Sequence, residues 1–80
     1  MNFFEGIISK ITSFGLSVDI AELGFNGFVR IDDLPGHFYR TYEGLRSERG
    51  SRRFKIGDYV PLRLYEVDFV RGAAYFKLTN

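Results

Sequence analysis

Residues 6–34 constrain the fold more than any other part of the chain, because three short segments there alternate apolar and polar residues and bend at glycines. The middle segment alternates strictly, through Leu16, Ser17, Val18, Asp19 and Ile20. In a strand, such alternation puts apolar side chains on one face of the sheet and leaves the other face to solvent. The sequence therefore predicts strands that are buried on one side only.

The same reasoning along the whole chain predicts five strands, over residues 3–12, 15–22, 27–31, 59–68 and 74–78. Gly6 predicts a bulge or sharp coil in the first strand, as a small closed barrel requires. Pro61 should lie near the start of the fourth strand or on an unpaired side, and the alternation of that strand slips before Val67. Closure into a barrel removes bare sheet edges. The expected fold class is therefore an all-β, five-stranded barrel with the outline of an OB-fold.

An insertion at about residues 32–57 separates the third and fourth strands, and it is longer than most loops of compact domains. Asp32 and Asp33 should end the third strand and cap a single helical turn. Apolar residues then follow at helical spacing, namely Phe38, Tyr39, Tyr42 and Leu45, and predict a short helix. Residues 46–53 are polar and arginine-rich around Gly50-Ser51 and predict a mobile loop, which a turn at Gly57-Asp58 closes.

The length of 80 residues favours one domain over residues 1–80. The chain has no cysteine, so it has no disulfide and no thiolate metal site, and a cytoplasmic location is expected. No apolar run approaches the length of a membrane span, and no membrane partner is expected. The net charge of +1 does not by itself indicate a nucleic-acid partner.

The solvent side of the predicted sheet carries the candidate binding residues. Phe14 is expected there as a platform on which a base can stack, whereas Phe28 fits a ligand contact and packing under the insertion equally well. A basic rim is expected around this face, from Lys10, Arg30, Arg71 and Lys77, although each alone is compatible with a solvated charge. Three loop arginines predict an electrostatic arm, with a flexible solvated surface as the alternative: Arg49, Arg52 and Arg53.

Catalytic chemistry is not expected in this chain. His37 is the only histidine and has no cysteine or carboxylate at ligand spacing, so it is interpreted as a loop residue. Asp32 and Asp33 fit a turn and a cap better than a metal pair. The chain contains no nucleophile triad, phosphate-binding glycine loop or carboxylate cluster. We therefore expect no catalytic residue, no metal and no cofactor.

Several glycines and apolar residues recur at the spacing of a known motif. The first run contains Gly6, Ile8, Ile11, Phe14, Gly15 and Val18. The second run is Gly27-Phe28-Val29-Arg30-Ile31, followed by Asp33-Leu34, and Gly57-Asp58-x-Val60 and Val67-Asp68 bound the fourth strand. Together they resemble the S1 motif, an RNA-binding repeat, over nearly the whole chain. The insertion, with Phe38-Tyr39-Arg40-x-Tyr42 and Phe54 to Asp58, is similar to the C-terminal S1 domain of the ribonuclease R family.

The sequence departs from that family pattern at three positions. The usual second aromatic is Ser17, the usual histidine of the third strand is Arg30, and the usual serine is Asp32. Loss of one stacking platform is expected to cost about 1–3 kcal/mol of binding free energy. Arg30 should recover part of this loss, because a guanidinium group also stacks on bases and pairs with phosphate. The resemblance therefore implies weakened RNA binding rather than its absence.

The resemblance implies that the domain holds single-stranded RNA, with little sequence preference, for an exoribonuclease that degrades RNA from the 3′ end. The magnesium-binding aspartates of such enzymes lie in a separate, larger domain, and nothing here matches it. The expected partners are thus single-stranded RNA and a covalently linked catalytic domain, and this chain alone should not cut RNA. Two alternatives remain open: a barrel repurposed for protein docking through its tyrosine-rich insertion, and a stand-alone RNA-binding protein.

Overall fold

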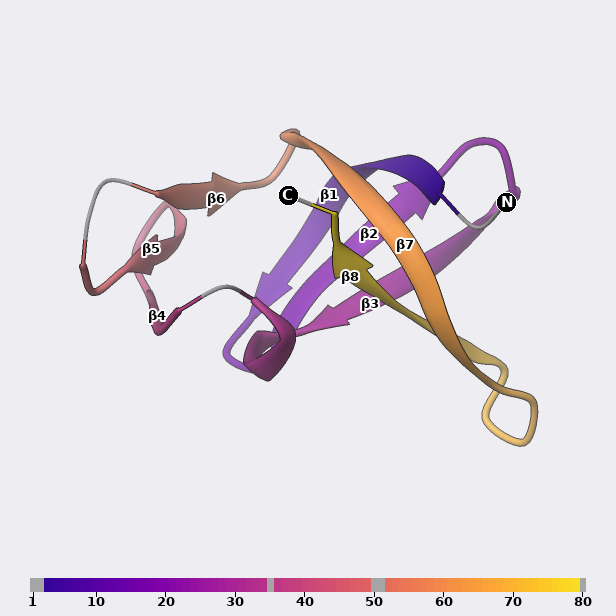
Figure 1. The fold of residues 1–80 in the computed structure, drawn as a ribbon. Helices are drawn as coiled ribbons and strands as arrows, with labels where there is room; N and C mark the ends of the chain where they lie inside the picture. Colours follow the sequence, from indigo (N-terminus) through magenta and orange to yellow (C-terminus); the bar gives the residue numbers. More distant parts are fainter. Residues whose placement is uncertain (1–2, 35, 50–51, 80) are drawn as a thin grey trace.

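Five strands close into a barrel in the order β1-β2-β3-β8-β7 (Figure 1), which confirms the predicted all-β class. The structure is a computed structural model and describes residues 3–34, 36–49 and 52–79. The barrel strands are β1 (Phe3–Thr12), β2 (Gly15–Ile20), β3 (Phe25–Arg30), β7 (Tyr59–Asp68) and β8 (Ala73–Leu78). Neighbouring strands are antiparallel except β3 and β8, whose parallel pairing at Phe28 and Tyr75 closes the barrel.

The barrel interior is filled by the apolar members of the alternating segments. Leu16, Val18 and Ile20 on β2 are at most 1% exposed, as the alternation predicts. Phe76 of β8 is fully buried, and its ring fits in the barrel only because the facing residue is Gly27. A Cβ atom at Gly27 would lie 2.2 Å from that ring. This contact links a glycine of the sequence motif to the packing of the core.

The irregularities of the barrel strands fall partly where the sequence predicted them. The register of β1 against β2 shifts between Ile8 and Lys10, so the bulge is not at Gly6 itself. Gly6 instead allows close packing, because a Cβ there would lie 2.8 Å from Cδ1 of Leu62. The register of β7 against β8 shifts between Leu64 and Glu66, which agrees with the phase slip expected before Val67.

Four strand ends differ from the prediction: the end of β2 and the start of β3 by two residues, and the end of β3 and the start of β8 by one. Strand β2 ends at Ile20, not at residue 22, because the carbonyl of Ile20 accepts hydrogen bonds from the N–H groups of Leu23 and Gly24. Those bonds form the turn, with Gly24 at a φ of +69°. Strand β3 then starts at Phe25, two residues earlier than expected.

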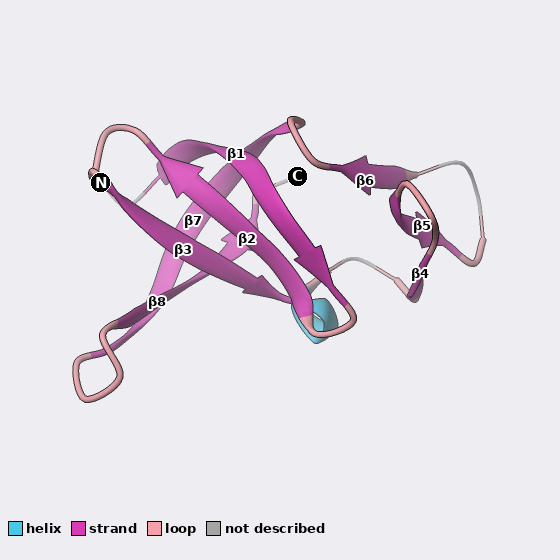
Figure 2. Ribbon diagram, turned by 180° about the vertical axis from the view of Figure 1, so that it is seen from behind, coloured by secondary structure: helices cyan, strands magenta, loops and turns pink. Residues whose placement is uncertain are grey.

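The insertion forms a second sheet, so the helix predicted over residues 38–45 is wrong (Figure 2). Its three strands are β4 (Phe38–Arg40), β5 (Gly44–Ser47) and β6 (Arg53–Lys55). The antiparallel arrangement pairs Leu45 with Phe54 and buries both in the core, and the rings of Phe38 and Phe54 lie 5.3 Å apart. This tertiary packing outweighs a helical spacing that spans only two turns.

The remaining expectations for the insertion are met in part. The single helical turn is η1 (Ile31–Asp33), but its N-cap is Arg30 and no aspartate side chain caps it. Arg46 and Arg53 belong to strands rather than to a loop, and the predicted mobility around Gly50-Ser51 lies outside the described residues. In both views the second sheet projects from one end of the barrel and the β7–β8 turn from the other (Figures 1 and 2).

Candidate nucleic-acid interface

The outward residues of β2, β3 and β8 form one continuous face of the barrel. Ser17 is opposite Phe28 in the β2–β3 pairing, and Phe28 is opposite Tyr75 in the β3–β8 pairing. Arg30 lies on the same side of β3, since side chains two residues apart in a strand share a face. The alternation that buries Val29 therefore presents two aromatic rings and one cation on neighbouring strands.

A surface hollow of about 640 Å³ lies on this face, a volume in the usual range of small-ligand sites. Its lining consists of Phe14, Phe28, Arg30, Ile31, Asp32, Arg71, Ala73 and Tyr75. Aromatic and cationic side chains thus surround a space large enough for a nucleobase. Surfaces that bind single-stranded nucleic acid combine the same two kinds of side chain.

Phe14 is the most accessible ring of the hollow. It sits in the β1–β2 turn and its side chain is 76% exposed, as the sequence predicted. Its backbone is fixed at both ends, because its N–H donates to Oγ1 of Thr12 at 3.1 Å and its carbonyl accepts from the N–H of Ile31 at 2.8 Å. The exposed ring is therefore held by an ordered turn.

Phe28 has an intermediate position between the two roles that the sequence left open. It is half-buried, lines the hollow and also covers Gly15, where a Cβ atom would lie 3.0 Å from Cζ of the Phe28 ring. The side chain thus packs on the β2 backbone while one part of it reaches the hollow.

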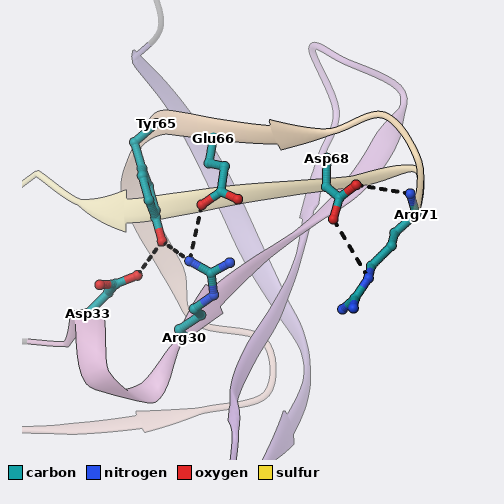
Figure 3. Close-up of polar contacts among 6 residues, drawn as sticks. All are labelled: Arg30, Asp33, Tyr65, Glu66, Asp68 and Arg71. Carbon is teal, nitrogen blue, oxygen red and sulfur yellow. Dashed lines mark hydrogen bonds and ion pairs between the residues drawn. The ribbon is translucent and has the colours of Figure 1, made fainter.

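Arg30 is held by the aromatic ring of Tyr75 and by the side chains of Tyr65 and Glu66, of which Figure 3 shows the last two. Its guanidinium carbon lies 3.8 Å from the centroid of the Tyr75 ring, a cation–π distance. Its Nη1 donates to the Tyr65 hydroxyl and to Oε1 of Glu66, the latter at 3.3 Å. The Tyr65 hydroxyl in turn donates to Oδ2 of Asp33 at 2.7 Å, so the helical turn η1 helps to position the cation through Tyr65.

The pKa values of this network shift in the directions that its contacts require. Desolvation lowers the pKa of Arg30, but the hydrogen bond to Glu66 and the charges of Tyr65 and Glu66 outweigh it, and the net pKa is raised. Desolvation and the bond to Asp33 raise the pKa of Tyr65 against the smaller opposing effect of Arg30. Arg30 is thus cationic and Tyr65 neutral at physiological pH.

The structure brings some of the expected cations to the hollow and leaves others at its edge. Arg71 lines it, and the Nε of Arg71 lies 3.7 Å from Oδ2 of Asp68 (Figure 3). Lys77, further along β8, has its Nζ 4.7 Å from the centroid of the Tyr65 ring. Lys10 is exposed on β1 at the position opposite Ser17. Neither lysine lines the hollow.

The three loop arginines are not part of this hollow. Arg53 belongs to β6, and Arg52 precedes it with its guanidinium carbon 5.2 Å from the centroid of the Phe54 ring. Arg49 follows β5, and its carbonyl accepts a hydrogen bond from the Ser47 hydroxyl. All three belong to the second sheet and its connections, so any role in binding concerns a different surface.

Sequence reasoning missed the two tyrosines that orient Arg30. The alternation of its strand predicts that Tyr75 points outward, but the sequence does not show which strand lies beside β3. Only the β3–β8 pairing places Tyr75 next to Phe28. Tyr65 lies at the register shift of β7, where alternation no longer predicts direction.

The described residues also bear on two expected absences. No group of three or more histidine, cysteine, aspartate or glutamate residues in residues 3–34, 36–49 and 52–79 is placed to hold a metal ion. Within the same residues, no helix has both the length and the apolar character needed to cross a bilayer.

Comparison with known proteins identifies the family of the domain. The sequence matches the family S1 RNA binding domain over residues 2–77. Ribonuclease R of Mycoplasma pneumoniae is 36% identical over 78 residues, which cover 94% of this chain and 11% of that protein. The apo form of Mycoplasma genitalium RNase R superposes with a TM-score of 0.87 at 34% identity, covering 95% of this chain and 12% of that one.

A second structure of the Mycoplasma genitalium enzyme, in complex with ribose methylated single-stranded RNA, gives a TM-score of 0.86 at 34% identity. It covers the same shares, 95% of this chain and 12% of that one. The chain thus spans about a ninth of the length of the relatives that it matches. The family match covers most of the sequence and both structures share its barrel, so this chain belongs to the S1 RNA-binding domain family.

Proposed function

We propose that this domain binds single-stranded RNA in the hollow between Phe14 and Tyr75. The observation that carries the proposal is the stacking of Arg30 on Tyr75 in a hollow that the exposed ring of Phe14 also lines. Membership of the S1 family and the similarity to an RNase R solved with single-stranded RNA support the same ligand.

Binding would combine stacking with phosphate contacts. A base can stack on Phe14, which is 76% exposed, with a contribution of about 1–3 kcal/mol. Arg30 and Arg71 lie on the lining and supply positive charge for the phosphate that joins this base to the next. Lys10 and Lys77 stand further out and would add long-range attraction. Stacking accepts any base, so little sequence preference is expected.

Arg30 stands where the family pattern has a histidine, and Ser17 stands where it has a second aromatic residue. With Ser17 on β2, the second aromatic of the platform is Tyr75 on β8, and Arg30 covers it with a guanidinium group. A guanidinium group stacks on bases and forms two parallel hydrogen bonds with phosphate. The site would therefore hold RNA through the open ring of Phe14 and through the guanidinium group of Arg30, which covers the ring of Tyr75.

We infer that the domain itself does not cleave RNA and that it serves a larger exoribonuclease. Asp32 is the one carboxylate among the described residues that line the hollow. Two carboxylates beside it are engaged by neighbours, because Asp33 accepts a hydrogen bond from Tyr65 and Glu66 accepts one from Arg30. They are thus poorly suited to hold catalytic magnesium, which needs free oxygen ligands. In a chain like ribonuclease R, the barrel would hold RNA and feed it to a separate catalytic domain.

A titration with an oligoribonucleotide tests the proposal. Amide shifts are expected in the β1–β2 turn and around Arg30 and Tyr75. The logarithm of the affinity should fall with the logarithm of salt concentration at about −0.7 for each phosphate contacted, or near −2 for three contacts. A lack of shifts on this face in low salt would contradict the proposal. It would favour protein docking, because a docking surface predicts no RNA affinity at any salt.

A further inference from the structure

The second sheet presents a row of outward side chains that is separate from the hollow at Phe14. Tyr39 of β4 is opposite Arg46 of β5, and Arg46 is opposite Arg53 of β6. Directly paired residues of antiparallel strands point to the same face. Lys55, two residues beyond Arg53, shares this face, and all four side chains are exposed. We call these four residues the insertion face.

The pairing of Arg46 with Arg53 is electrostatically unfavourable in the free protein. Like charges directly opposite in an antiparallel pair destabilise the sheet. Within the described part of the chain, the structure gives neither of these arginines, nor Lys55, an ion pair with a carboxylate. The cost would be relieved by an anion that contacts both arginines at once.

A hollow of about 570 Å³ lies beside this row and shows what kind of anion fits. Arg46, Arg53 and Lys55 line it together with Tyr42, whose side chain is fully exposed. Two carboxylates, Glu43 and Asp58, also line it, and one oxygen of Asp58 accepts a hydrogen bond from the backbone N–H of Lys55 at 3.0 Å. The side chains therefore combine cations with tyrosine rings, which suits a chain of phosphates that carries bases.

We propose that the insertion face is a second contact surface for the same single-stranded RNA, beyond the hollow at Phe14. This proposal rests on the proposed RNA binding by the barrel. Arg46 and Arg53 would contact successive phosphates, and Tyr39 or Tyr42 would stack on a base. RNA long enough to reach from the barrel to the second sheet would gain these contacts, whereas a short RNA would occupy the barrel alone.

The test compares uridine oligonucleotides of about 4 and about 16 nucleotides, the limits of site sizes found for OB-folds. The variant is Arg46→Gln/Arg53→Gln, and its control is Arg40→Gln/Arg63→Gln, which removes the same charge. Arg40 pairs with Leu45 on the opposite face of the second sheet, and Arg63 lies on β7. Thermal unfolding of each variant verifies the fold, and the first should be at least as stable as wild type.

We expect Arg46→Gln/Arg53→Gln to flatten the salt dependence for the long RNA by about 1.4, from two phosphate contacts at about 0.7 each. Binding of the short RNA should match that of the control variant. The long RNA should also shift amide signals of β5 and β6, and the short RNA should not. Equal behaviour of the two double variants toward the long RNA would overturn the proposal.

Phe14→Ala separates this failure from a failure of the barrel site. If Phe14→Ala weakens both RNAs while the two double variants behave alike, the barrel binds RNA and the insertion face does not. If Phe14→Ala and Arg46→Gln/Arg53→Gln both leave affinity unchanged, the RNA is bound neither in the hollow at Phe14 nor on the insertion face, and both proposals fail. If poly-glutamate of the same charge shifts the amide signals of β5 and β6 as much as the long RNA does, RNA is overturned as the occupant of the insertion face.

Discussion

The guanidinium carbon of Arg30 lies 3.8 Å from the centroid of the Tyr75 ring, on two strands that pair in parallel where the barrel closes. Tyr65 and Glu66 hold the same guanidinium group from β7. The cation is therefore placed by three strands, and a ligand that stacks on it or pairs with it need not order it first. Such preorganisation reduces the entropy lost on binding.

Replacement of Arg30 by lysine should separate the geometry of this group from its charge. Arg30→Lys keeps one positive charge but loses the flat fork that stacks and bonds in pairs. We expect weaker RNA affinity with an unchanged salt dependence. Arg30→Gln should also flatten the slope by about 0.7. Affinity measured by fluorescence anisotropy over a series of salt concentrations distinguishes the two variants. Identical salt slopes for the wild type, Arg30→Lys and Arg30→Gln would show that Arg30 contacts no phosphate.

Truncation of Phe14 should weaken RNA binding without unfolding the barrel. The side chain is 76% exposed, so Phe14→Ala removes little core packing but deletes a stacking surface of about 1–3 kcal/mol. Phe25→Ala is the matched control, because Phe25 is also an exposed phenylalanine, at the far end of β3. Loss of thermal stability in Phe14→Ala, with unchanged affinity, would mean that the ring serves packing instead.

Removal of the Tyr65 hydroxyl should change the pH dependence of stability in the alkaline range. The pKa of Tyr65 is raised above its ordinary value of 10.0 by desolvation and by the bond to Asp33. A raised pKa in the folded state means that the stabilisation is complete below pH 10 and is lost as pH rises through the folded-state pKa. Urea unfolding of the wild type should therefore show a steeper alkaline loss of free energy than Tyr65→Phe. Parallel profiles would contradict the raised pKa.

At neutral pH the same variant should be slightly less stable and should bind RNA less well. Tyr65→Phe removes one bond to Asp33 and one from Arg30, and each part-buried hydrogen bond contributes about 0.5–1.5 kcal/mol. With Arg30 less restrained, RNA affinity should fall while the salt slope stays the same. An unchanged affinity would limit Tyr65 to a role in stability.

Addition of one methyl group at Gly27 should destabilise the barrel without touching its outer face. The Cβ of Gly27→Ala would lie 2.2 Å from the Phe76 ring, which is itself fully buried. Overpacking of this kind costs about 1–3 kcal/mol. Asn26→Ala is the control, since Asn26 is the exposed neighbour on the same strand. Equal midpoints of urea unfolding for the two variants would show that the core adapts to the methyl group.

The sequence by itself determined the barrel strands. Strand β1 and strand β7 agree with the predicted bounds, and the exposure of Phe14 was expected from alternation and motif spacing. These features could be predicted because the facing direction of a side chain in a strand depends on local parity, and because glycines mark positions where backbones bend or approach closely.

The tertiary structure decided which strands meet and what the insertion becomes. Tyr75 contacts Arg30 only because β8 lies beside β3, a pairing between distant parts of the chain that no local pattern specifies. The apolar residues of the insertion favour a helix only weakly over so short a span. Burial of Leu45 and Phe54 against the barrel selects the strand, because the free energy of that packing exceeds the weak local preference for helix.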